Sequence, residues 1–486
     1  MTFPPYGPPT WDPIESPAGS RRSRRGLVIA AGATAVLLLG GAGYAVASFL
    51  SGGGQQPEDV LPADTLGFVK LDLDPSAGQK MELSSLLAKF PSVTTEGDGD
   101  VRGQLLDPLL DEAETGLEFT ADVQPWLGAR MAVAAVPAAK AREAGVVPVM
   151  AVAVTDEEAM TEALTRAQAN TDFGFAVRGD YVLITDTQER ADSIADAEET
   201  LVDDADFAGD RDALGGDQIA LAWADLSEAQ GILEAAAGAG GGYDQETLSG
   251  RVILGVHAED DALEMVGMDF SVSDFGVPDS EPTRLLQDLP DDTLAALSVS
   301  GAGNAAVQAW EEMESSGALA EIEGPLNDLG LELPEDLRAF LGTDLVVAAF
   351  GQLNEPQVGL RVVTDDGERA GEVADLLLAD SGIGLETVST PVDDGLVVAM
   401  DGPTADALAA GNGGLGDAEG FRSAVADPDT ARAIGYLDLA AVVEQLIAEG
   451  GETGEEAAKY SAVEALGFSA TSTDEGGRFV LRISTR

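Results

Sequence analysis

The chain has 486 residues, of which 45% are hydrophobic and 23% charged, and it contains no cysteine. This composition is typical of a globular protein with a sizeable core. Acidic residues number 87 against 26 lysines and arginines, a formal net charge of −61, which excludes nucleic acid as a partner because the phosphates would be repelled. The lack of cysteine excludes thiol nucleophiles, iron–sulfur clusters and cysteine-based zinc sites, and the single histidine leaves almost no imidazole chemistry.

The N-terminal segment, residues 1–25, is rich in proline, glycine and serine and ends in a cluster of four arginines. We expect a disordered cytoplasmic tail, because such a sequence buries too little apolar surface to offset the entropy of ordering. Residues 26–50 are uncharged, and a helix of this length crosses a hydrocarbon core of about 30 Å. The preceding arginines predict that the N-terminus is cytoplasmic and that the remainder is extracytoplasmic.

Two alternatives to a retained transmembrane helix are open at this stage. Ala45-Val46-Ala47 before Ser48 resembles a signal-peptide cleavage site, and Ser23-Arg24-Arg25 resembles part of a twin-arginine signal. Either would release the protein. The long polar tail and the length of the apolar run favour a membrane anchor instead.

The remainder of the chain, after a Gly/Gln linker at residues 51–59, contains an internal repeat. Leu61-Pro62-Ala63-Asp64-Thr65-Leu66 recurs as Leu289-Pro290-Asp291-Asp292-Thr293-Leu294, and the stretch from Leu127 recurs 214 residues later from Leu341. Asp225 and Asp438 also correspond, and each is expected to cap a following helix. These matches predict two homologous domains, residues 60–278 and 279–486.

The first repeat mixes strand-like and helix-like patterns. Strands are expected at 67–72, 130–136, 146–154, 181–185, 219–223 and 252–270, the last with a turn at 259–261, and helices at 157–170, 188–199 and 226–237. Some strands follow each other without an intervening helix, which argues against a purely parallel sheet. The predicted fold class is therefore α+β, with an N-terminal transmembrane helix followed by two tandem domains whose sheets are largely antiparallel or mixed.

Catalytic and cofactor motifs give no positive prediction. Asp72-x-Asp74-x-Ser76 begins like a calcium loop but lacks the turn glycine and the final bidentate acid, so no metal or other cofactor is predicted. His257 lies in an alternating strand and is interpreted as an ordinary strand residue, because one imidazole without other ligands makes neither a catalytic triad nor a metal site.

Several stretches of the first repeat resemble a known family. Leu71-Asp72-Leu73-Asp74-Pro75-Ser76-Ala77-Gly78-Gln79-Lys80, then Phe90-Pro91 and Pro125-Trp126-Leu127-Gly128, follow the Arg-flanked apolar run. Together they resemble actinobacterial membrane-anchored proteins of unknown function, the DUF3352-like family. The resemblance implies a single-pass protein of the bacterial plasma membrane, and it implies no reaction, cofactor or catalytic residue.

A candidate ligand or partner site is suggested where the repeats diverge, at Asp72, Ser76, Gln79 and Lys80. Copy two has no such charged set, and Lys80 is treated as an exposed residue. The competing interpretation is structural, with Asp74 capping a helix that begins at Pro75.

The leading functional interpretation is a cell-envelope membrane protein whose acidic outer part binds an envelope protein or cell-wall partner, or contributes to an assembly. The alternative is a carboxylate-based hydrolase of envelope carbohydrate or peptide, with or without a divalent cation. The sequence predicts no oligomeric state.

Overall fold

The computed structural model describes most of the chain after residue 53. The described residues are 54–90, 115–138, 145–227, 250–270, 280–316, 330–381, 387–411, 413–473 and 476–486, with isolated positions at 102, 103, 106, 110 and 319.

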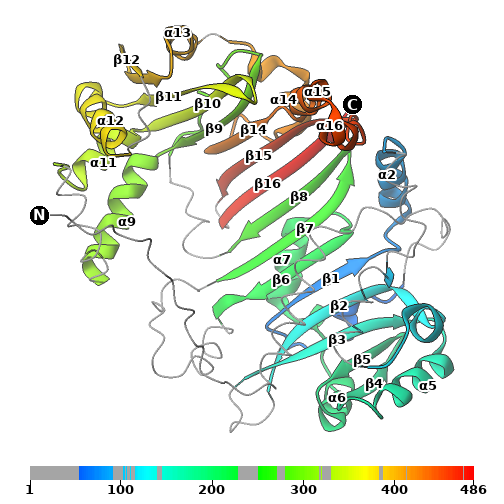
Figure 1. Ribbon diagram of the computed structural model, residues 1–486. Helices are drawn as coiled ribbons and strands as arrows, with labels where there is room; N and C mark the ends of the chain where they lie inside the picture. Colours follow the sequence, from blue (N-terminus) through cyan, green and yellow to red (C-terminus); the bar gives the residue numbers. More distant parts are fainter. Residues whose placement is uncertain are drawn as a thin grey trace, which may run out of the picture.

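These residues form a single sheet of 16 strands in which every pairing is antiparallel (Figure 1). The strands of the first half are β1 Gly67–Asp72, β2 Leu127–Pro137, β3 Val146–Val154, β4 Gly174–Arg178, β5 Tyr181–Thr185, β6 Ala220–Asp225, β7 Arg251–Glu259 and β8 Ala262–Asp269. Those of the second half are β9 Thr293–Ser300, β10 Asp344–Gln352, β11 Glu355–Val363, β12 Val388–Val392, β13 Gly395–Ala399, β14 Ala433–Leu437, β15 Val463–Thr473 and β16 Gly476–Thr485.

Helices connect and cover the strands. In the first half they are η1 Pro57–Asp59, α2 Ala77–Ala88, η2 Phe119–Val123, α5 Glu157–Ala167, α6 Gln188–Ala195, η3 Leu201–Asp203 and α7 Ala205–Leu214. In the second half they are α9 Ala302–Ser316, α11 Glu335–Leu341, α12 Gly367–Ser381, α13 Gly402–Ala410, η6 Leu415–Asp417, α14 Glu419–Ala424, α15 Leu439–Glu449 and α16 Gly451–Ala458.

The two halves of the sheet have the same strand order. From the centre outward, the first half reads β8-β7-β6-β1-β2-β3-β5-β4, and the second reads β16-β15-β14-β9-β10-β11-β13-β12. Each strand of one half therefore has a counterpart at the same place in the other half.

The halves are joined where β8 pairs with β16. Val266 of β8 lies opposite Val480 of β16, and these two valines stand 214 positions apart, the spacing of the sequence repeat. Corresponding strands thus meet antiparallel about a local pseudo-two-fold axis. The pairing satisfies backbone groups that an isolated half would expose along its edge strand.

Both faces of the sheet are packed against helices. We call the face that bears Phe207 of α7 and Phe421 of α14 face A, and the opposite face, against which α2 packs, face B. On face A, the Phe207 ring contacts Phe68 and Trp223 edge-on, with centroids 5.6 and 5.5 Å apart, and both Phe207 and Phe421 are fully buried. Each half thus has its own aromatic centre on face A.

The fold-class prediction of a transmembrane helix followed by two tandem domains is wrong in this form. The described part of the chain contains no helix with the length and apolarity that a membrane crossing requires, and the predicted span, residues 26–50, lies outside the described residues. The two predicted domains do not have separate sheets, because β8 and β16 join them into one. The boundaries at 60–278 and 279–486 stay a prediction.

A shared sheet predicts that the two halves unfold together. Phe207→Leu and Phe421→Leu each remove buried ring contacts, and each should cost about 1–3 kcal/mol. Urea denaturation followed by tryptophan fluorescence and far-UV circular dichroism should show one transition, which either variant shifts to lower urea. Val177→Ala on the half-exposed edge strand β4 should leave the midpoint unchanged. Two transitions, each sensitive to only one of the phenylalanine variants, would contradict a cooperative sheet.

Candidate functional site

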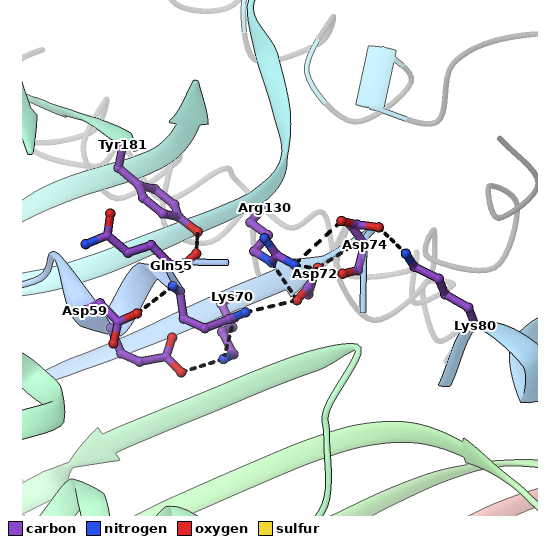
Figure 2. A network of polar contacts seen from close by, with 10 residues as sticks. Gln55, Asp59, Lys70, Asp72, Asp74, Lys80, Arg130 and Tyr181 are labelled. Atoms are coloured by element: carbon purple, nitrogen blue, oxygen red, sulfur yellow. Dashed lines mark hydrogen bonds and ion pairs between the residues drawn. The ribbon is translucent and has the colours of Figure 1, made fainter. Parts of the chain in front are cut away.

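The four predicted site residues lie between the end of β1 and the first turns of α2. Asp72 is the last residue of β1, Ser76 is the N-cap of α2, and Gln79 and Lys80 are in its first turns. Figure 2 shows the polar network around Asp72 and Lys80. The structure therefore brings these residues into one region, but they contact different partners.

Ser76 and Gln79 have structural contacts. The Ser76 hydroxyl accepts a hydrogen bond from the backbone N–H of Gln79 at 3.4 Å, so the helix cap is Ser76 and the expectation that Asp74 caps this helix is wrong. The Gln79 side chain makes two hydrogen bonds with the backbone of Ala258 on β7, donating at 3.1 Å and accepting at 2.9 Å. These bonds attach α2 to face B of the sheet.

Asp72 and Lys80 belong to a buried chain of alternating charges. Asp72 accepts hydrogen bonds from Arg130 Nε at 2.9 Å and from the backbone N–H of Asp74 at 2.8 Å. Arg130 also donates to the backbone carbonyl of Asp74 at 2.9 Å, and the Asp74 carboxylate pairs with Lys80. Because Lys80 is 6% exposed, the expectation of an exposed lysine is wrong.

A second ion pair lies next to this chain, on the segment that precedes β1. Lys70 Nζ donates to Glu58 Oε1 at 2.6 Å and to the side chain of Gln56 at 3.2 Å. The amide nitrogen of Gln56 lies 3.4 Å from Asp72 Oδ2, which connects the two groups (Figure 2). Lys70 and Glu58 are 7% and 2% exposed.

The network fastens residues 55–59 to the sheet. Besides the contacts of Gln56 and Glu58, the Tyr181 hydroxyl donates to the backbone carbonyl of Gln55 at 2.9 Å, and burial raises the pKa of this phenol. Half of the predicted linker, residues 51–59, is therefore packed against β1 and β5.

The electrostatics indicate a closed network. The acids Glu58, Asp72 and Asp74 alternate with the bases Lys70, Arg130 and Lys80, so the buried charges balance. Burial alone would lower the pKa of Arg130, but the hydrogen bond and charge of Asp72 raise it. A charged ligand could bind here only by displacing a buried ion pair, so the arrangement is suited to holding segments together.

The sequence reasoning missed two central members of this network, Glu58 and Arg130. A signal for one of them was present, because the repeat aligns Arg130 with Asp344 and Lys70 with Ser298. At these two positions the first half has basic residues that form ion pairs, whereas the second half has an uncharged serine and an aspartate.

Removal of one member of a buried ion pair should lower the free energy of unfolding, because the remaining charge is buried without a partner. Lys70→Met leaves the Glu58 carboxylate buried without its ion partner, and we expect a loss of about 3 kcal/mol in unfolding free energy. The double variant Glu58→Gln/Lys70→Met should recover at least half of that loss, as measured by urea denaturation. Arg422→Met, at the exposed pair with Asp417, should cost less than about 0.5 kcal/mol. Equal losses in the single and double variants would contradict this assignment.

The corresponding place in the second half holds hydroxyl groups and one acid. Thr283 Oγ1 lies 2.6 Å from the Ser298 hydroxyl and donates to Asp344 Oδ1 at 2.8 Å. Burial raises the pKa of Asp344 to about 6, against the opposing effects of its hydrogen bonds with Thr283 and with the backbone of Leu345. In the described part of the chain this carboxylate forms no ion pair like Asp72–Arg130, although the charge of Arg361 favours its ionised form, so its ionisation is costly.

The raised pKa predicts a pH-dependent penalty. An acid whose pKa is higher in the folded state binds its proton more tightly there, so its contribution to stability is lost as pH rises from about 4 to 6. Asp344→Asn should therefore be more stable than the wild type by about 1–2 kcal/mol at pH 7, after allowance for solvent screening. Urea denaturation at pH 4 should show no such advantage. A variant that is less stable at pH 7 would overturn the prediction.

The two predicted capping aspartates differ in what the structure describes. Asp438 accepts a hydrogen bond from the backbone N–H of Ala441 at 2.8 Å and caps α15, which confirms that prediction. Asp225 ends β6, and most of the helix predicted after it, 226–237, lies outside the described residues.

Comparison with known proteins identifies a family for part of the chain. Residues 28–175 match the model of a family described as "Protein of unknown function (DUF3352)". This match confirms the predicted resemblance to the DUF3352-like family over that segment, and the actinobacterial source stays a prediction. No curated protein and no solved structure matches the chain.

Proposed function

We propose that this chain is an acidic binding or assembly module of the cell envelope, and that it binds a partner protein through the apolar centre of face B. The observation that carries the proposal is a set of exposed aliphatic side chains on three strands of the sheet. Leu297 of β9, Val347 of β10 and Ile483 of β16 are 49%, 40% and 37% exposed.

The strand registers place these residues in a continuous apolar surface. Leu297 lies directly opposite Val347 on one side and Gly435 on the other. Following the pairings across β10, β9, β14, β15, β16 and β8 gives three transverse rows without a charged or polar side chain. The rows are Leu345-Val299-Ala433-Ala470-Phe479-Gly267, Val347-Leu297-Gly435-Phe468-Leu481-Met265 and Ala349-Ala295-Leu437-Leu466-Ile483-Leu263.

We call these three rows the apolar band. It crosses the junction between the two halves, and the rings of Phe468 and Phe479 lie together in it with centroids 6.4 Å apart. At the first-half end of the band, Leu263 packs with Leu83 and Leu86 of α2, while Figure 1 leaves the middle of β15 and β16 in view. Apolar surface with several exposed aliphatic side chains, as here at Leu297, Val347 and Ile483, commonly marks a protein interaction site.

Charge selects the kind of partner. The chain carries a net charge of −61, so a second copy would be repelled around any apolar contact. A partner with an apolar centre and a basic border would bury the band and pair with acids around it. The proposed occupant is therefore a basic-bordered envelope protein.

The hydrolase alternative has no comparable support in the described residues. Five of the deeply buried acids are each paired with a base, namely Glu58, Asp72, Asp210, Glu264 and Asp336. The hydrolase stays a prediction.

Site-specific photo-crosslinking in the native cell envelope tests the proposal. A photoreactive amino acid in place of Leu297 should give a discrete adduct with a basic protein, whose yield falls at high salt. The control position is Val177 on β4, which is 40% exposed and apolar but lies at the outer edge, and it should give no such adduct. Adding Val347→Glu should abolish the Leu297 adduct without a change in melting temperature.

Three outcomes would overturn the proposal. They are the absence of an adduct at Leu297, adducts of equal yield at both positions, and an adduct of twice the chain's own mass, which would identify a second copy as the occupant.

A further inference from the structure

We propose that the first half of the sheet carries a divalent-metal site of the zinc class, formed on face A by His257, Glu259 and Glu264 at the β7–β8 hairpin. One ligand atom from each of these residues lies within 4.8 Å of the other two. The proposal is independent of the apolar band, which lies on the opposite face.

Strand register brings the three ligands together. His257 of β7 lies directly opposite Glu264 of β8, and Glu259 is two residues along β7, so its side chain points to the same face. The Nε2 atom of His257 is 3.5 Å from Glu264 Oε1 and 3.5 Å from Glu259 Oε2. Separations of this size are those of atoms that share one small cation, since zinc binds nitrogen and oxygen at about 2.0–2.2 Å.

Arg482 of β16 prepares one of the ligands. It lies opposite Glu264 in the strand register and donates to the Oε2 atom at 2.6 Å. The other oxygen, Oε1, faces His257. Arg482 thus holds the carboxylate in place and is a positioning residue, in the manner of the outer-shell groups that orient metal ligands.

The burial of Glu264 and His257 and the net negative charge of the site favour the binding of a cation. The side chains of Glu264 and His257 are 5% and 16% exposed, while that of Glu259 is 56% exposed and leaves access from solvent. With a neutral imidazole, the two glutamates and Arg482 leave one negative charge, within a chain whose net charge is −61. One imidazole and two carboxylates suit zinc or manganese, and three protein ligands leave a coordination position for water.

The second half lacks this constellation. The positions 214 residues later than His257, Glu259 and Glu264 are Thr471, Thr473 and Arg478. Arg478 lies opposite Thr471 on β15, so the matching place presents a guanidinium and a hydroxyl. The ligands therefore belong to the first half alone, although the backbone pairing is the same.

The single histidine makes the site directly observable. In full-length protein labelled with ¹⁵N-histidine, titration with Zn²⁺ should move the one imidazole Nε2 resonance and saturate at one equivalent. A large excess of Mg²⁺ occupies the general acidic surface during the titration. Zn²⁺ should also raise the melting temperature, because it binds the folded state.

Substitutions separate the site from unspecific binding. His257→Gln and Glu259→Gln should each weaken Zn²⁺ binding about tenfold or more and remove the gain in melting temperature. The matched control is Glu355→Gln, which removes an exposed acid at the start of β11 and should change neither. Three results would overturn the proposal: an imidazole resonance that Zn²⁺ does not move, a stoichiometry far above one with no saturation, or equal affinity in the His257 variant and the control.

Discussion

The pairing of β8 with β16 is the constraint on which the architecture depends. Without it, each half would end in a long strand with unpaired backbone groups, which is the condition under which sheets aggregate. With it, the edge strands of the two duplicated halves form backbone hydrogen bonds with each other. Val266 and Val480 at the centre show why this works: corresponding residues meet about a pseudo-two-fold axis, so one strand sequence pattern serves both sides.

Duplication also explains how the halves came to differ without changing the sheet. At the Lys70 position, the first half has buried ion pairs and the second has a hydroxyl cluster around Asp344. The backbone register is the same in both cases, because β1 and β9 each lie between two corresponding neighbours. Side chains at corresponding positions of the two halves could therefore diverge while the backbone pairing stayed the same. The polar residues around His257 likewise differ from their counterparts in the second half.

Local features of the fold could be predicted from the sequence, and long-range ones could not. The expected strands at 67–72, 146–154 and 181–185 coincide with β1, β3 and β5, because apolar runs bounded by turns carry a local signal. β4 was missed, since Gly174–Arg178 is short and ends in a charged residue. The β8–β16 pairing joins residues as far apart as Glu264 and Arg482, and no local pattern encodes the partner of an edge strand. For the site, the comparison of the two repeats singled out Lys80. Its burial depends on how α2 packs against the sheet, and the sequence carries no local signal for that packing.

The central position of β16 has a consequence for biosynthesis. Glu264 and Arg482 are 218 residues apart, and translation proceeds at about 5–20 residues per second, so β8 waits about 10–40 seconds for its partner strand. During that interval the first half presents an open edge next to a hairpin that is already formed. A protein built in this way depends on what shields that edge while the chain emerges, so its yield in a cell is governed by chaperone binding during synthesis as much as by the stability of the finished sheet.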